Sequence, residues 1–86
     1  MQEITMFHMK TCPYCVKAKG FIETLLQENP KYGEIKINYI DEQVEVELAN
    51  SYDYYYVPTF YVNGEKLHEG AATLEDVREV FKAALK

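Results

Sequence analysis

Lys10-Thr11-Cys12-Pro13-Tyr14-Cys15 is the stretch that decides the fold of this chain, and it holds both of the chain's cysteines. It follows a short apolar run that begins at Ile4 and opens a segment with helical periodicity, so the thiols lie at a strand-to-helix junction. A C-x-x-C pair in that position is typical of redox sites. A thiol at a helix N-terminus faces unpaired backbone N–H groups and the positive end of the helix dipole, and both favour the nucleophilic thiolate.

The composition is that of a small folded chain with an acidic surface. A hydrophobic fraction of 48% and an aromatic fraction of 14% argue against disorder, and the length predicts a single domain over residues 1–86. The formal net charge of -5 supplies no basic face for a phosphate backbone, so we expect no nucleic-acid partner. Lys10, Lys17 and Lys19 bracket the cysteines, and their charge also favours thiolate there.

The apolar runs are too short for a membrane span, and the first strand begins almost at Met1 without a signal peptide. We therefore expect no membrane partner and a cytoplasmic location, where a lone disulfide is usually transient and catalytic. The alternative is a structural disulfide, but so short a loop constrains the unfolded chain little and would be a weak stabiliser.

The first half of the chain predicts a strand and then a helix. Residues 3–9 form the strand, with Ile4 and Met6 on one face. Thr11-Cys12-Pro13 predicts a helix start, because a proline in the first turn lacks only an N–H that would have been unpaired. Asn29-Pro30 ends this helix. Its inward stripe is expected to contain Ala18, Phe21, Ile22, Leu25 and Leu26.

A second strand is predicted over residues 34–40. Asp41 is expected to cap a short acidic helix that carries Val44, Leu48 and Tyr52 inward.

The second half predicts a β-hairpin followed by a helix. The strand formers of residues 59–62 precede Asn63-Gly64, a pair that favours a type I′ turn, and residues 65–69 return as the partner strand. Thr73 and Asp76 then have the spacing of a capping box, with Asp in place of the usual Glu. The buried stripe of the last helix is expected to contain Leu74, Val77, Val80, Phe81, Ala84 and Leu85.

The predicted order is therefore β-α-β-α-β-β-α, in the α/β class. The first two strands should be parallel with a right-handed crossover, and the last two antiparallel. A mixed four-stranded sheet flanked by three helices accommodates every element, and this is the thioredoxin fold.

The motif Lys10-Thr11-Cys12-Pro13-Tyr14-Cys15 resembles the active-site signature of dithiol glutaredoxins, and Val57-Pro58 before a strand and Asn63-Gly64 resembles the family's second half. The resemblance covers nearly the whole chain. It implies a thiol–disulfide oxidoreductase with Cys12 as the attacking thiol and Cys15 as the resolving thiol. It also implies a cis bond at Val57-Pro58, facing the cysteines, with the Val57 backbone pairing an extended substrate. Cys12 at the helix tip should be exposed to solvent, and Cys15, about one turn in, more shielded.

The same resemblance implies a site for glutathione as electron donor. Lys10 and Tyr14 would line it, Gly70 would allow a close backbone approach, and the N–H groups after Thr73 would serve a carboxylate. The expected partners are disulfide-containing protein substrates together with glutathione or a flavoprotein reductase of the thioredoxin-reductase type, acting on a monomer.

The segment Glu69-Gly70-Ala71-Ala72-Thr73 departs from the glutaredoxin pattern. Glu69 replaces one glycine of a Gly-Gly pair, and Ala72 or Thr73 stands where an Asp would orient the anion. A negative charge at Glu69 would weaken glutathione binding. Pro58-Thr59, Asn63-Gly64-Glu65 and Gly70-Ala71 look more like the later half of thioredoxin, so a thioredoxin-like carrier reduced by a flavoprotein is the alternative.

A non-catalytic metal-binding module is the alternative from another class. A zinc site of two cysteines and two histidines would need His8 and His68 to converge on the thiols. His68 is too far along the outer hairpin, so we expect no metal and two ordinary strand histidines, exposed or half-buried.

The run Tyr52, Tyr54, Tyr55 and Tyr56 has two interpretations. It could form a partner-binding surface, since tyrosine is enriched at interfaces. We expect at least half of it to pack under the helix-to-strand loop instead, and Tyr56 to lie at the rim of the site.

Overall fold

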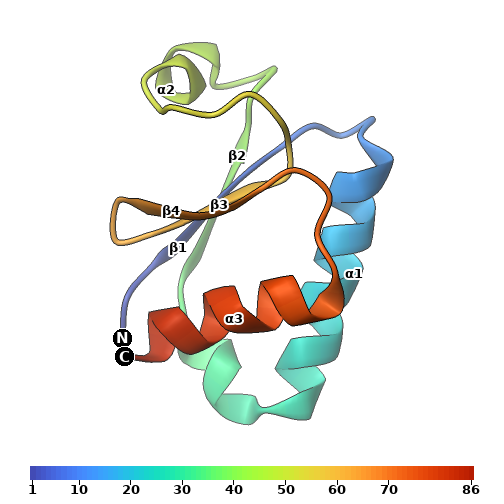
Figure 1. The fold of residues 1–86 in the computed structure, drawn as a ribbon, viewed down its shortest axis with the longest axis vertical. Coiled ribbons are helices and arrows are strands. Elements are labelled where there is room, and N and C mark those ends of the chain that lie inside the picture. The colour runs from blue at the N-terminus through green and yellow to red at the C-terminus, as the bar shows by residue number, and fades with distance from the viewer.

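The computed structural model describes residues 1–86 as a mixed sheet with helices on both faces (Figure 1). Its elements are β1 (Ile4–His8), α1 (Pro13–Glu28), the 3₁₀ helix η1 (Pro30–Glu34), β2 (Ile37–Asp41), α2 (Val46–Asn50), β3 (Thr59–Val62), β4 (Glu65–Glu69) and α3 (Leu74–Leu85).

The sheet has four strands in the order β2-β1-β3-β4. β1 and β2 are parallel, with Ile4 opposite Ile37, while β3 runs antiparallel to both β1 and β4. The predicted order and strand directions are confirmed. The two ends of the chain lie side by side (Figure 1), and the Gln2 N–H donates to the Ala84 carbonyl at 2.7 Å.

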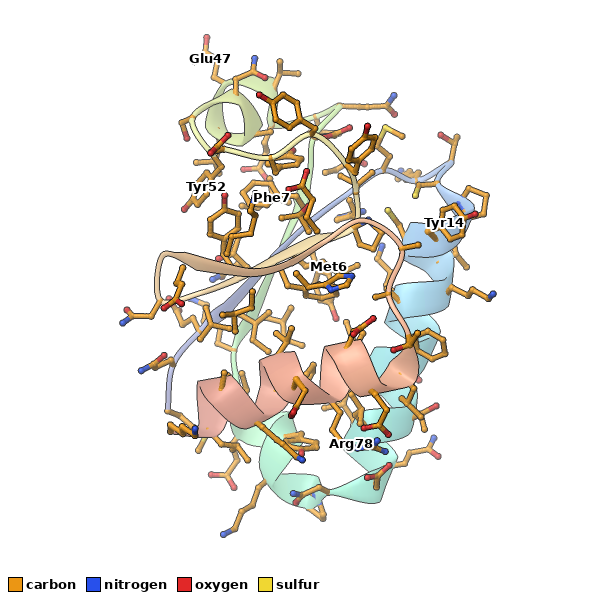
Figure 2. The ribbon with its side chains drawn as sticks, viewed as in Figure 1. Met6, Phe7, Tyr14, Glu47, Tyr52 and Arg78 are labelled. Atoms are coloured by element: carbon orange, nitrogen blue, oxygen red, sulfur yellow. The ribbon has the colours of Figure 1, made fainter.

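The alternation of side chains along the central strands creates two cores. Ile4 and Met6 point toward α1 and α3, where they join Phe60 and Phe81 in the larger core. Phe7 points to the opposite face and packs with the Tyr52 ring under α2 (Figure 2). Neighbouring residues of a strand face opposite ways, so β1 contributes side chains to both cores. Packing on both of its faces fixes the position of the C-terminal end of β1.

Several local structures that the sequence predicted are present. α1 begins at Pro13 with Cys12 as its N-cap, and it ends before Asn29. Asn63 and Gly64 both have positive φ, 52° and 81°, as a type I′ turn requires. Both hydrogen bonds of the Thr73–Asp76 capping box form: each residue's side chain accepts the backbone N–H of the other. Val77, Val80, Phe81 and Ala84 of α3 are buried, with Leu74 and Leu85 packed at the edge.

The middle of the chain corrects two expectations about where elements begin. The second strand starts at Ile37 and not at residue 34, because Pro30 opens the 3₁₀ helix, whose first turn is capped by the Asn29 side chain. Asp41 does not cap α2: its carboxylate accepts the Gln43 N–H at 2.9 Å and forms a turn, and the helix begins later.

The inward residues of this region also differ from the prediction. Val44 is 74% exposed and Leu48 is exposed as well, and Ala49 is the residue of α2 that packs inward. Tyr52 packs as expected. In α1, Leu26 lies at the solvent edge because the buried stripe follows Ala18, Ile22 and Leu25.

None of the helices combines the length and the apolar character that a membrane crossing requires.

Candidate active site

The two cysteines lie at the junction between β1 and α1, and both thiols are free. Cys12 is the N-cap of α1, and its Sγ accepts the backbone N–H of Cys15 at 3.2 Å. This bond arises because a helix leaves its first N–H groups without partners inside the helix. Negative charge on Cys12 is therefore met by a hydrogen-bond donor and by the positive end of the helix dipole.

Cys15 lies one turn further on and is 1% exposed. Its burial, followed by the influence of the neighbouring Cys12 side chain, raises its pKa to about 12. The backbone amide of Met9 and the charge of Lys19 act in the opposite direction. Cys15 therefore stays protonated as the thiol of the pair.

The Val57–Pro58 peptide bond is cis, as the resemblance implied. The Val57 carbonyl lies 3.8 Å from Cys12 Sγ, so the turn before β3 covers the start of α1. Cys12 was expected to be exposed to solvent, but this contact covers it, and it is only 7% exposed. Sequence spacing could not show this, because the two residues are 45 positions apart.

The residues expected to hold glutathione lie on several segments of the chain. Lys10 is exposed on the loop before Cys12, and Tyr14 is 56% exposed in the first turn of α1 and projects from it (Figure 2). Gly70 has a φ of 90°, and its N–H donates to the Pro58 carbonyl at 2.8 Å. Thr73 caps α3 and accepts the Asp76 N–H.

Glu69 has a structural task that the sequence did not reveal. Its carboxylate accepts the N–H groups of Tyr55 at 2.6 Å and Tyr56 at 3.0 Å, and it pairs with Lys66 at 2.7 Å. The ammonium group and the two N–H groups lower the pKa of Glu69 to about 2. Its charge is thus neutralised locally and anchors the loop that leads to Val57. The only signal in the sequence was an acidic residue in a place where the family has glycine.

The tyrosine run divides as predicted. The rings of Tyr52 and Tyr54 lie 4.7 Å from that of Phe7, and the Tyr54 hydroxyl donates to Glu42 at 2.7 Å. Tyr55 and Tyr56 are 86% and 70% exposed, directly before Val57.

The histidines lie apart from each other. His68 is half-buried on β4, with its Nε2 3.0 Å from the Ala71 carbonyl oxygen. His8 is buried at the end of β1, which corrects the expectation that it is exposed or half-buried. Its Nδ1 lies 3.4 Å from Lys19 Nζ. No group of three or more His, Cys, Asp or Glu side chains is placed to hold a metal ion.

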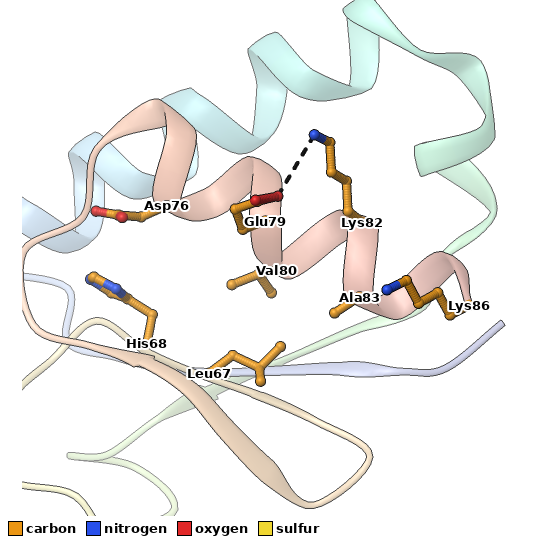
Figure 3. A pocket seen from close by; sticks show the side chains of 8 residues that line it. All are labelled: Leu67, His68, Asp76, Glu79, Val80, Lys82, Ala83 and Lys86. Carbon is orange, nitrogen blue, oxygen red and sulfur yellow. Dashed lines mark ion pairs between the residues drawn. The ribbon is translucent and has the colours of Figure 1, made fainter.

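The cavities of the molecule lie away from the cysteines. One of about 530 Å³ separates β4 from α3 and is lined by His68, Asp76, Glu79 and Lys82 among others (Figure 3). The other two flank β2, one toward α2 and one toward α1. None is lined by Cys12, Cys15 or the residues expected to hold glutathione.

Comparison with known proteins finds matches that cover most of this chain. The sequence model of the family described as Glutaredoxin matches residues 4–67. The thioredoxin of Methanocaldococcus jannaschii is 31% identical over 83 residues, which are 96% of this chain and 95% of that protein.

Solved structures show the same fold. A mutant thioredoxin from Halobacterium salinarum superposes with a TM-score of 0.72 at 20% identity, covering 99% of this chain and 75% of that one. Oxidised thioredoxin from Plasmodium falciparum gives 0.72 at 19% identity, covering 95% and 79%. The predicted thioredoxin fold is confirmed.

Proposed function

The chain belongs to the glutaredoxin family and is a thiol–disulfide oxidoreductase, and we propose that Cys12 is its attacking thiol and Cys15 its resolving thiol. The observation that carries this assignment is the position of Cys12 at the N-cap of α1, with Cys15 buried one turn further on. The backbone N–H of Cys15 donates to Cys12 Sγ, whereas burial raises the pKa of the Cys15 thiol. A hydrogen-bond donor stabilises negative charge on Cys12 Sγ, and burial disfavours it on Cys15, so Cys12 is assigned as the nucleophile.

The first step is attack of the Cys12 thiolate on a substrate disulfide. A Cys12–substrate disulfide forms, the substrate's own S–S bond breaks, and one substrate sulfur leaves as thiolate. In the second step Cys15 loses its proton to solvent and attacks Cys12 Sγ. The mixed disulfide breaks, the second substrate sulfur leaves, and the Cys12–Cys15 disulfide remains. The substrate gains the two electrons that the two cysteines lose.

The turn at Val57 and Pro58 supports extended protein substrates. The carbonyl of Val57 lies against Cys12 Sγ, so a chain bonded to Cys12 would run past this backbone. Tyr55 and Tyr56 expose aromatic surface on the same turn, and tyrosine contributes large contact areas at protein interfaces.

For the electron donor we favour glutathione, bound weakly. Lys10 offers a cation for one carboxylate beside Cys12. Lys66 and two backbone N–H groups neutralise the Glu69 carboxylate, so we no longer expect it to repel the carboxylates of glutathione. Binding is expected to be weak because Asp76 and Thr73 already occupy two donors at the start of α3.

The same capping box favours the second candidate donor, a flavoprotein reductase of the thioredoxin-reductase type. Glu75 and Asp76 place negative charge in the first turn of α3, where an anionic tripeptide would need positive potential. A protein donor that contacts Cys12 directly needs no such anion site.

A coupled assay separates the two donors. A peptide with one disulfide serves as substrate, and NADPH consumption is followed with glutathione plus glutathione reductase, or with thioredoxin reductase alone. We expect faster turnover with glutathione, rising with its concentration without early saturation. Turnover with thioredoxin reductase only would select the second donor.

Matched variants test the glutathione contact. Lys10→Gln should lower the glutathione-dependent rate severalfold at low salt, and the difference should shrink at high salt because the contact is an exposed charge pair. Lys17→Gln removes the same charge from an exposed position of α1 and should have no such effect. Equal effects of the two variants would exclude Lys10 as a glutathione contact. Cys12→Ser should abolish turnover with either donor.

A further inference from the structure

Lys19 lies one helical turn after the buried Cys15 in α1, and we propose that Lys19, held in place by His8, supplies the positive charge that stabilises the Cys15 thiolate when this thiol resolves the mixed disulfide. The inference rests on the proposed roles of Cys12 and Cys15. His8 acts here as a positioning residue.

Lys19 lies on the inner side of α1. It follows Cys15 by four residues, so the two side chains are neighbours on one face of the helix. Lys19 is half-buried, whereas Lys17 is exposed. The ammonium of Lys19 lies 3.4 Å from His8 Nδ1 and 5.7 Å from the centre of the Tyr39 ring. A lysine that served only solubility would leave its head group in water.

His8 holds this ammonium from the end of β1. An ammonium only donates, so His8 Nδ1 accepts, and the ring is neutral with its proton on Nε2. Burial, followed by the charge of Lys19, lowers the pKa of His8, while Asp41 acts in the opposite direction.

The remaining polar groups around the Lys19–His8 pair come from two elements. Tyr39 and Asp41 belong to β2, and Glu23 belongs to α1 and lines a small cavity with Lys19. The Tyr39 ring meets the His8 ring edge-on at 6.2 Å.

The resolving step needs such a charge. Cys15 has to lose its proton before its sulfur attacks Cys12 Sγ and expels the substrate thiolate. Burial opposes this ionisation, and the two groups that favour it are the Met9 amide and Lys19. Met9 directly follows His8, the last residue of β1, so the amide and the residue that positions the lysine are neighbours at the end of this strand.

Stopped-flow oxidation by dithiobis(nitrobenzoate) separates the two steps. Attack by Cys12 releases one nitrothiobenzoate in a phase that depends on reagent concentration. Attack by Cys15 on the mixed disulfide releases the second in a phase independent of reagent concentration. The sum converts two thiols and one reagent disulfide into the protein disulfide, two aromatic thiolates and two protons.

Lys19→Met should slow the second phase at neutral pH by roughly tenfold and move its pH midpoint up by about one unit, since one unit of pKa is a factor of ten in thiolate. The first phase should change less than about twofold, because one unit of charge outside the Cys12 contacts has little effect there. Lys19→Arg should restore the second phase. His8→Phe should slow it in the same direction, by a smaller factor.

Lys17→Met is the matched control, since it removes an equal charge from the exposed side of α1. The inference is overturned if Lys19→Met and Lys17→Met have equal second phases, or if Lys19→Met slows both phases alike. A wild-type protein with no concentration-independent phase would instead refute the roles of Cys12 and Cys15. Far-ultraviolet circular dichroism checks folding, and if Lys19→Met fails to fold, the pH midpoints of Lys19→Gln and His8→Phe decide the same question: unshifted midpoints overturn the inference.

Discussion

Glu69 fixes the loop that carries Val57 to Cys12. One carboxylate oxygen accepts two successive backbone N–H groups, from Tyr55 and Tyr56, and the other pairs with Lys66. A carboxylate with three donors of this kind is stabilised as the anion. The loop beside the active thiol is therefore tied to strand β4 through one side chain.

This arrangement predicts a pH-dependent stability. The pKa of Glu69 is lowered from its ordinary 4.5 to about 2 in the folded chain, so its contribution is fully present above pH 4.5 and lost as the pH falls toward 2. Glu69→Gln should therefore be less stable than wild type at pH 6, with the difference shrinking below pH 4.5. Urea unfolding at a series of pH values measures it.

Glu65→Gln is the control for Glu69→Gln, because Glu65 is exposed on the same strand. Its stability relative to wild type should be nearly independent of pH. A Glu69→Gln difference that stays constant down to pH 2.5 would contradict the assigned role of the carboxylate.

The sequence predicted those site residues whose chemistry is local. The Cys-x-x-Cys spacing and the capping by Thr73 follow from a few neighbouring residues, and the family resemblance implied the cis bond before Pro58. The burial of Cys12, the anchoring by Glu69 and the Lys19–His8 pair each join positions far apart in the chain. Such contacts depend on how the elements pack, and periodicity alone does not carry that information.

At the scale of elements, the quality of the capping signals decided what could be predicted. α1 has a proline at its start and Asn29-Pro30 at its end, and the β3–β4 turn has Asn63-Gly64. α2 has no side-chain cap, since Glu45 makes no such hydrogen bond. The start and the buried face of α2 were therefore predicted wrongly. The apolar residues near it are compatible with more than one start of the helix and more than one buried face.

The capping box of α3 gives a prediction at this scale. Thr73→Ala removes the acceptor of the Asp76 N–H and should lower the free energy of unfolding by about 1 kcal/mol. Thr24→Ala is the matched control, because the Thr24 hydroxyl bonds only the Gly20 carbonyl of its own helix and is exposed. It should change stability by no more than about 0.5 kcal/mol. Equal losses in urea unfolding would argue against the cap.

At the scale of the whole molecule, the larger and the smaller core hold different parts of the structure in place. The larger core packs α1 and α3 onto the sheet. The smaller core packs Tyr52 and Tyr54 on Phe7, and these tyrosines begin the loop that ends at Val57. The smaller core therefore controls how that loop lies over Cys12.

Phe7→Leu and Phe81→Leu test this division. Both rings are fully buried, so each substitution should cost about 1 to 3 kcal/mol of stability. Only Phe7→Leu should also change the rate at which iodoacetamide alkylates Cys12, because it loosens the covering turn. If both variants alter alkylation equally, the cores do not act separately on the site.

The central claim is that Cys12 attacks and Cys15 resolves, and trapping tests it most directly. Cys15→Ser and Cys12→Ser are each incubated with a peptide containing one disulfide, and the products are examined by intact mass and peptide mapping. The account predicts a stable peptide adduct on Cys12 in Cys15→Ser, almost none in Cys12→Ser, and only the internal disulfide in wild type. An adduct that forms on Cys15 of Cys12→Ser as fast as on Cys12 would contradict it.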